Sequence, residues 1–226
     1  MKKGSLHPIT QFLREVIKHF ESLGLEVYET PEAETEWYNF DALNVPADHP
    51  SRDEQDTFWL KDGRVLRTHT SSGQLHAAED KKLPIRVVMP GRCYRNEATD
   101  QTHEATFYQL DCLYIDKDVK VGHLFWTLEL LFKKIYGDDA KIRFRPHNYP
   151  FVEPGFDVDM LVNEKWVEML GSGMVHPKVI QNMGFDPNKY SGFAFGLGID
   201  RLCMKKFGIE DIRNLYNMDL RFLKQF

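Results

Sequence analysis

The sequence has 226 residues and a net charge of −5, from 29 Lys and Arg against 34 Asp and Glu. This length fits one large domain, residues 1–226, with a substantial core, and the acidic balance argues against a generally basic nucleic-acid-binding domain. No apolar run is long enough to span a membrane and no signal-peptide core begins the chain, so we expect a cytoplasmic protein without membrane contact.

The first predicted element is an amphipathic helix over residues 8–23. Pro8 suits a first helical turn, apolar residues recur at helical spacing as far as Leu23, and Gly24 provides a C-terminal cap. A strand over residues 25–30 follows and ends at Pro31. Periodicity leaves open whether this helix packs on its own domain or forms an interface.

The rest of the chain alternates short strands with helices, without an internal repeat or linker. A proline-containing loop over 41–52 precedes a hairpin of 57–60 with 65–68, built on the turn at Lys61-Asp62-Gly63. Further helices are predicted at 72–80, at 121–136 and from about Gly198 onward. Strands are predicted at 85–89, 92–97, 106–116, 141–145, 156–162 and 166–170. The fold class is therefore α+β, with a mostly antiparallel sheet flanked by helices.

The first informative motif is Gly91-Arg92-Cys93-Tyr94-Arg95-Asn96-Glu97, followed after a polar loop by Phe107-Tyr108-Gln109-Leu110-Asp111. Alternate side chains of a strand share a face, so a hairpin presents Arg95 and Glu97 together with Phe107, Gln109 and Asp111. An arginine fork suits an α-phosphate because it donates two hydrogen bonds and stays charged. A surface hairpin with an Arg–Glu cross-strand pair would show the same alternation.

The second motif is Gly196-Leu197-Gly198-Ile199-Asp200-Arg201, at the start of the last helix. Gly196 and Gly198 leave room for a ligand to approach the backbone, and Arg201 in the first turn is placed to stack on a purine and pair with a phosphate. The stretch is not a dinucleotide fingerprint, because Arg201 replaces the third glycine, and no G-x-x-x-x-G-K-[ST] occurs.

Metal and disulfide patterns are also missing from the sequence. The nine histidines include no H-E-x-x-H, which argues against a dedicated zinc site. The three cysteines are widely spaced without a C-x-x-C pair, which favours free thiols in a reducing compartment.

Together the two arginine motifs describe a nucleoside triphosphate site without a phosphate-binding glycine loop, as in class II aminoacyl-tRNA synthetases. Over essentially its whole length the chain resembles the α subunit of bacterial phenylalanyl-tRNA synthetases. Besides the two motifs, the blocks that carry the resemblance are Asn39–Asn44, His49–Arg52, Asp56–Trp59, Leu66–Ser71, Pro150–Gly155, Gly173–Pro177 and Ser191–Gly196.

The resemblance implies ATP as a substrate and a role for each residue of the ATP site. Arg95 would hold the α-phosphate with Glu97 near the adenine, and His103 would meet the terminal phosphates. Phe107 and Arg201 would stack on the two faces of the adenine. Arg95 and Arg201 are thus the expected catalytic residues, and the ATP-binding set is Arg95, Glu97, His103, Phe107, Gly198 and Arg201.

The resemblance also implies a phenylalanine site. The residues expected around the ammonium and carboxylate are His69, Ser71, Gln109 and Asp111, and those expected around the ring are Tyr149, Phe151 and Ala194, with Trp59, Gln74 and Gly196 completing the amino-acid site. Glu153 matches a position of a Mg²⁺ site shared with the β subunit. Simpler interpretations are core packing for Tyr149 and Phe151, a structural hydrogen bond for His69 and a solvated loop carboxylate for Glu153.

Three departures from the family pattern affect the expected specificity. Asp111-Cys112 stands where the family usually has Glu-Gly, Tyr149-Pro150-Phe151 where it has Phe-Pro-Phe, and Asp200 where Glu commonly precedes the arginine. The family's N-terminal coiled-coil arm, which grips tRNA, has no counterpart before His7, so we expect either a trimmed chain or a naturally short paralogue.

The predicted function is ATP-dependent activation of phenylalanine and its transfer to tRNA(Phe). The expected partners are the β subunit, in a heterotetramer or similar assembly, and tRNA(Phe), with self-association through residues 8–31 as a further expectation. One alternative is a synthetase-like enzyme that activates an amino acid for a non-tRNA acceptor. The other is a non-catalytic regulatory or binding paralogue, against which the intact Arg95, Glu97, Phe107 and Arg201 argue.

Overall fold

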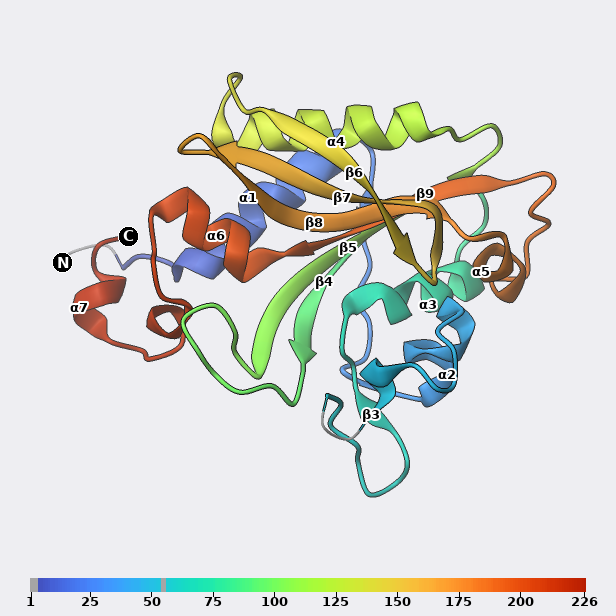
Figure 1. Cartoon of the computed structure of the whole chain (residues 1–226), viewed down its shortest axis with the longest axis horizontal. Coiled ribbons are helices and arrows are strands. Elements are labelled where there is room, and N and C mark those ends of the chain that lie inside the picture. Colours follow the sequence, from blue (N-terminus) through green and yellow to red (C-terminus); the bar gives the residue numbers. More distant parts are fainter. Residues whose placement is uncertain (1–3, 54–55) are drawn as a thin grey trace.

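A seven-stranded sheet organises the fold, as Figure 1 shows. The computed structural model describes residues 4–53 and 56–226. The strand order is β1-β4-β5-β9-β8-β7-β6, and β1 with β4 is the parallel pair in an otherwise antiparallel sheet. The strands are β1 Glu26–Val27, β4 Ile85–Tyr94, β5 Thr106–Asp116, β6 Ile142–Tyr149, β7 Val152–Val162, β8 Lys165–Val175 and β9 Ser191–Gly198. The predicted α+β class with a mostly antiparallel sheet is confirmed.

One face of the sheet is covered by three helices, α1 Pro8–Ser22, α4 Val121–Tyr136 and α6 Ile199–Phe207. Phe12, Val16 and Phe20 of α1 are fully buried in the core that these helices share with the sheet. The apolar stripe of the N-terminal helix therefore packs on its own sheet, which is one of the two alternatives left open by its periodicity.

The opposite face is covered over only part of its area. A second core joins the sheet to α2 Glu36–Asn39, α3 Gly73–Asp80 and α5 Pro177–Asn182, which lie together near one end of the sheet (Figure 1). A small two-stranded sheet of β2 Ala33–Glu34 and β3 Val65–Leu66 borders this core. The uncovered remainder of the face is where the candidate site lies.

Three strand predictions need correction. The strand expected over 25–30 is only two residues long, because the chain then leaves β4 to form β2. The expected hairpin of 57–60 with 65–68 is reduced to a single bridge between Trp59 and Val65, since β3 pairs with β2. The strands expected at 85–89 and 92–97 are one strand that ends at Tyr94. It runs through Pro90 because β1 covers only Val87 and Val88, and beyond them β4 is an edge strand that tolerates proline.

The helices over 121–136 and from Gly198 are confirmed, and the helix expected over 72–80 is found as α3, one residue shorter. β6, β7 and β8 are longer than predicted, and β9 and α5 were not predicted. The loop region 41–52 contains short 3-10 turns at Asp41–Leu43 and Pro50–Arg52. No helix within residues 4–53 and 56–226 combines the length and the apolar character that crossing a membrane requires.

Candidate active site

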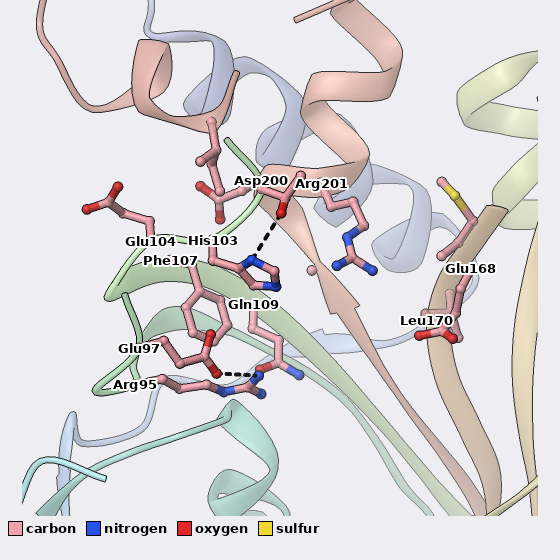
Figure 2. Close-up of a pocket in the computed structure, with 14 residues that line it drawn as sticks. Arg95, Glu97, His103, Glu104, Phe107, Gln109, Glu168, Leu170, Asp200 and Arg201 are labelled. Atoms are coloured by element: carbon pink, nitrogen blue, oxygen red, sulfur yellow. Dashed lines mark hydrogen bonds and ion pairs between the residues drawn. The ribbon is translucent and has the colours of Figure 1, made fainter. Parts of the chain in front are cut away.

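All six residues expected at the ATP site line one cavity of about 210 Å³ on the uncovered face of the sheet. Figure 2 shows the side chains of Arg95, Glu97, His103, Phe107 and Arg201 converging from the segment between β4 and β5, the start of β5 and the first turn of α6. The six are Arg95, Glu97, His103, Phe107, Gly198 and Arg201, and Gln109 lines the same cavity.

The register between β4 and β5 explains how Arg95 reaches Phe107. Cys93 lies directly opposite Phe107, so both side chains share a face, and the Arg95 amide donates to the Ala105 carbonyl at 2.9 Å just past the end of β4. The guanidinium of Arg95 lies 4.9 Å from the centre of the Phe107 ring and 3.9 Å from the Glu97 carboxylate. The predicted strand parity therefore holds, although Arg95 and Glu97 lie beyond the strand itself.

Arg201 approaches the cavity from α6, on a different side from Arg95 (Figure 2). Asp200 fixes the start of this helix, because its carboxylate accepts hydrogen bonds from the Tyr108 amide at 2.6 Å and from the Tyr216 hydroxyl. Burial raises the pKa of Asp200 to about 6. Among the residues that the structure describes, the exposed Arg201 has no hydrogen bond or ion pair, so its guanidinium is available to an anionic ligand.

His103 lies in the loop between β4 and β5, at the mouth of the cavity. Its Nδ1 lies 3.0 Å from Oδ2 of Asp100. The loop also contacts the C-terminal segment, because the Ile212 amide donates a hydrogen bond to the Gln101 carbonyl at 3.0 Å. The His103 side chain is exposed.

A buried carboxylate forms the centre of the expected amino-acid site. Asp111 is 2% exposed and accepts hydrogen bonds from Thr70 Oγ1 at 2.9 Å, from the Ser71 hydroxyl and from the side chain of Gln74. Burial raises the pKa of Asp111 to about 6, and these hydrogen bonds oppose the shift. The structure thus brings Ser71, Gln74 and Asp111 together.

Gly196 connects this carboxylate to the ATP cavity. It lies opposite Asp111 in the β5–β9 register, and a Cβ added there would meet Gln109 Nε2 at 2.6 Å and Asp111 Oδ1 at 3.0 Å. The absent side chain is what allows both groups to lie against the sheet. Since Gln109 also lines the ATP cavity, the two expected sites adjoin.

His69, two residues before Ser71, is neutral near pH 7. Its Nδ1 is shielded and has no hydrogen-bond partner within residues 4–53 and 56–226. Burial, followed by the charges of Arg95 and Arg67, lowers the pKa of His69 to about 3. A neutral imidazole can donate or accept a hydrogen bond, but it adds no charge to the site.

The residues expected around the aromatic ring lie outside the ATP cavity. Phe151 and Trp59 pack against the core that contains the buried Ala194, next to α3 and α5. Tyr149 and Phe151 are stacked with ring centres 5.6 Å apart, and the Tyr149 hydroxyl donates to Asp157 Oδ1 at 2.7 Å. This hydroxyl therefore has a partner inside the chain.

Glu153 does not form a complete metal site with its neighbours. Its side chain is 72% exposed and lies 3.3 Å from His176, at an open depression of about 590 Å³. Within the described part of the chain, no three His, Cys, Asp or Glu side chains are grouped so that they could hold a metal ion. A Mg²⁺ ion at this position would therefore take most of its ligands from other groups.

Arg67 is a site-forming residue to which the sequence analysis gave no role. It is 2% exposed, and its guanidinium donates to the carbonyls of Thr30, Pro31 and Arg92 and to the Thr30 hydroxyl, at 2.7–3.0 Å. A Cβ at Gly91 would overlap it. Its charge acts on both Asp111 and His69. In the sequence, only its position two residues before His69 indicated that Arg67 lies near the site.

The fold corresponds to that of a class II synthetase core. The family described as tRNA synthetases class II core domain (F) matches residues 1–226. Pyrrolysyl-tRNA synthetase from Desulfitobacterium hafniense has the same fold, with a TM-score of 0.73 and 17% identity over 92% of this chain and 72% of that one.

Closer relatives are phenylalanine–tRNA ligase alpha subunits. That of Caldicellulosiruptor saccharolyticus is 46% identical over 99% of this chain and 69% of its own length. Those of Clostridium perfringens and Alkaliphilus oremlandii are each 48% identical, over 99% and 100% of this chain and 69% and 70% of their own lengths. The chain therefore belongs to the phenylalanine–tRNA ligase alpha subunit family of the class II tRNA synthetases. The three cysteines are free, as the sequence predicted, and the structure buries all three.

Proposed function

We propose that residues 1–226 act as one catalytic domain that activates phenylalanine with ATP and transfers it to tRNA(Phe). The observation that carries the proposal is the position of Gln109, which lines the ATP cavity and also lies against Gly196 beside Asp111. An amino acid whose ammonium is bound at Asp111 would thus hold its carboxylate next to a triphosphate bound between Arg95 and Arg201.

Activation consists of one in-line displacement. A carboxylate oxygen of the amino acid forms a bond to the α-phosphorus of ATP, the bond to pyrophosphate breaks, and the aminoacyl adenylate remains. The attacking group is already an anion, so no general base is needed and catalysis rests on positioning and charge stabilisation. Arg95 and Arg201 are proposed to stabilise the charge that develops on the phosphates, with Glu97 and Phe107 orienting the adenine and His103 meeting the terminal phosphates.

The amino acid is proposed to bind with its ammonium at Asp111. Ser71, Gln74, Gln109 and neutral His69 provide the hydrogen-bonding groups around it, and Gly196 keeps the floor open. Tyr149 and Phe151 are proposed to form the wall for the ring together with Ala194, with Trp59 nearby. Two stacked rings offer an aromatic substrate the offset and edge contacts that it prefers.

Transfer completes the proposed reaction. A terminal ribose hydroxyl of tRNA(Phe) attacks the acyl carbonyl, and AMP leaves. We propose that this step takes place in the cytoplasm in a complex with a β subunit, as a heterotetramer or similar assembly, with Mg²⁺ accompanying ATP. Glu153, which has too few neighbouring ligands for Mg²⁺ alone, is proposed to complete a Mg²⁺ site with groups of that subunit.

Amino-acid-dependent ATP–pyrophosphate exchange tests the proposal, run on the chain co-purified with a β subunit and with each amino acid in turn. Phenylalanine is expected to give the highest rate, and tRNA(Phe) is expected to accept the label. Exchange without tRNA charging, but with transfer to small amines, would point to a synthetase-like paralogue. Absence of exchange with every amino acid would leave a non-catalytic paralogue and would refute the proposal.

A further inference from the structure

A row of register partners crosses the site face of the sheet from one buried carboxylate to another. Asp111 on β5 faces Gly196 on β9, Gly196 faces Gly171 on β8, and Gly171 faces Asp157 on β7. Asp157 is 2% exposed, as Asp111 is. Register partners share a face, so Asp157 lies on the same surface as the proposed amino-acid site, three strands from Asp111.

The side chain of Tyr149 lies over the middle of this row. A Cβ added at Gly171 would meet the Tyr149 hydroxyl at 2.8 Å and its Cζ at 2.9 Å, so the phenol end rests on the bare backbone of that glycine. The neighbouring glycine, Gly196, is the one that accommodates Asp111 and Gln109. The Tyr149 ring therefore borders the space in which the amino acid is proposed to bind.

Every polar group of this pair already has a partner. The Tyr149 hydroxyl donates its single proton to Asp157 Oδ1 at 2.7 Å. The other oxygen, Oδ2, lies 3.1 Å from the Arg145 guanidinium and 3.0 Å from His147 Nδ1. Neither the hydroxyl proton nor the carboxylate is left for a ligand at this end of the site.

We propose that Asp157 is a specificity-determining residue. Its carboxylate and the Tyr149 hydroxyl mask each other, which means that each occupies the hydrogen-bonding group of the other. The wall of the site is therefore apolar towards the substrate ring. The proposal rests on the proposed function. It explains how a tyrosine can border the proposed amino-acid site without turning the site towards hydroxylated amino acids.

Removing the donor and removing the acceptor of this hydrogen bond are expected to change substrate selectivity in different ways. Tyr149→Phe leaves a buried carboxylate oxygen without its donor, and a hydroxyl on the substrate ring can take that place. Asp157→Leu leaves the phenol without an acceptor, so an apolar substrate ring covers an unsatisfied hydroxyl. An unpaired buried polar group weakens binding by about 5- to 150-fold. The double variant removes both groups and restores an apolar wall.

The proposal is tested by pyrophosphate exchange of the αβ complex with phenylalanine, tyrosine and 3-hydroxyphenylalanine. Tyr149→Phe is expected to raise kcat/KM for a hydroxylated substrate relative to phenylalanine by about tenfold or more. Asp157→Leu is expected to raise KM for phenylalanine by a similar factor, and the double variant to return both quantities to within about threefold of the parent. Asp157→Asn keeps an acceptor oxygen for the phenol, so its KM for phenylalanine is expected to rise less than that of Asp157→Leu.

Arg145 and His147 do not become buried unpaired groups in these variants. Their side chains are 42% and 46% exposed, and Arg145 keeps a contact of 2.7 Å to Asp159. Thermal unfolding checks that each protein is folded. If Asp157 were merely structural, the double variant would be as impaired as Asp157→Leu, and that result would overturn the proposal, as would unchanged selectivity in Tyr149→Phe.

Failure of the proposed function has a different signature. An αβ complex of parent sequence that shows no phenylalanine-dependent exchange refutes the function, whatever the variants do. In that case, the increase in melting temperature caused by each of the three amino acids gives the same comparison without catalysis. Equal ligand-induced increases in the parent, Tyr149→Phe, Asp157→Leu and the double variant would then overturn the masking role.

Discussion

Replacing Gly196 by alanine would place a methyl group among the side chains proposed to hold the amino acid. An alanine Cβ would lie 2.6 Å from Gln109 Nε2 and 3.0 Å from Asp111 Oδ1, where ordinary contact begins at 3.4 Å. One of these groups must therefore move. Asp111 is fixed by Thr70 and Ser71, whereas the Gln109 amide is the end of a flexible side chain, so we expect Gln109 to move by about 0.8 Å, the difference between 3.4 and 2.6 Å.

The expected effect on stability is small and that on activation is large. Because a flexible side chain absorbs the overlap, the free energy of unfolding should fall by only about 1 kcal/mol. Losing a hydrogen bond to a charged substrate group costs about 1.5–3 kcal/mol, which corresponds to a fall of about 10- to 150-fold in kcat/KM for phenylalanine. KM for phenylalanine should rise more than KM for ATP.

Pyrophosphate exchange at varied phenylalanine and then varied ATP measures this effect, and urea unfolding measures stability. Gly122→Ala in α4 is the control, because a Cβ there meets no atom within 4 Å, and it should leave both KM values unchanged. A folded Gly196→Ala protein with the parent kcat/KM for phenylalanine would show that Gln109 and Asp111 do not contact the amino acid.

The remaining predictions concern four charged side chains. Arg95→Ala and Arg201→Ala should remain folded but lose about 2–5 kcal/mol of transition-state stabilisation in pyrophosphate exchange. The control is Arg86→Ala, because Arg86 is exposed and paired with Asp116 at 3.4 Å. Parent exchange rates in either site variant would refute the proposed phosphate-stabilising roles of Arg95 and Arg201. Only the ionised Asp111 pairs with an ammonium, so kcat/KM for phenylalanine should fall as pH drops through about 6. If Asp111→Asn shows the same fall in kcat/KM below pH 6, another group causes it. Arg67→Met should lower the free energy of unfolding by about 3 kcal/mol or more, because several buried acceptors lose their donor; a loss below about 1 kcal/mol in urea unfolding would contradict the buried network.

Local sequence patterns were enough to predict that Arg95, Glu97, Phe107 and Gln109 share one face and line one cavity. The alternation from Cys93 to Glu97 and from Phe107 to Asp111 set the facing side chains, and the hairpin register placed Cys93 opposite Phe107 as expected. Gly198 correctly indicated the start of the last helix, and a Cβ there would meet no atom within 4 Å, whereas the space over Gly196 is occupied by Gln109 and Asp111. These features depend on residues close in sequence, for which strand and helix periods are reliable guides.

The rest of the site depends on contacts between distant segments. β9 was not predicted because Gly192, Gly196 and Gly198 weaken the strand pattern, although this strand lies at the centre of the sheet. The role of Asp157 follows only from its pairing with Gly171 and from the side chain of Tyr149. Arg67 reaches Thr30 and Arg92 across the fold, and no periodicity encodes such a contact.

The last prediction concerns assembly. The apolar residues of α1 are used within its own core, so an interface over residues 8–31 must use the polar face of the helix and the edge strand β1. Val27 on that strand is 39% exposed, and an unpaired strand edge favours association.

The net charge of −5 gives the chain little attraction for a polyanionic tRNA. We therefore expect the chain alone to self-associate or be marginally stable, and tRNA charging to require a β subunit. Light scattering of the purified chain and charging assays with and without that subunit measure both properties. A monodisperse monomer that charges tRNA efficiently by itself would contradict both arguments.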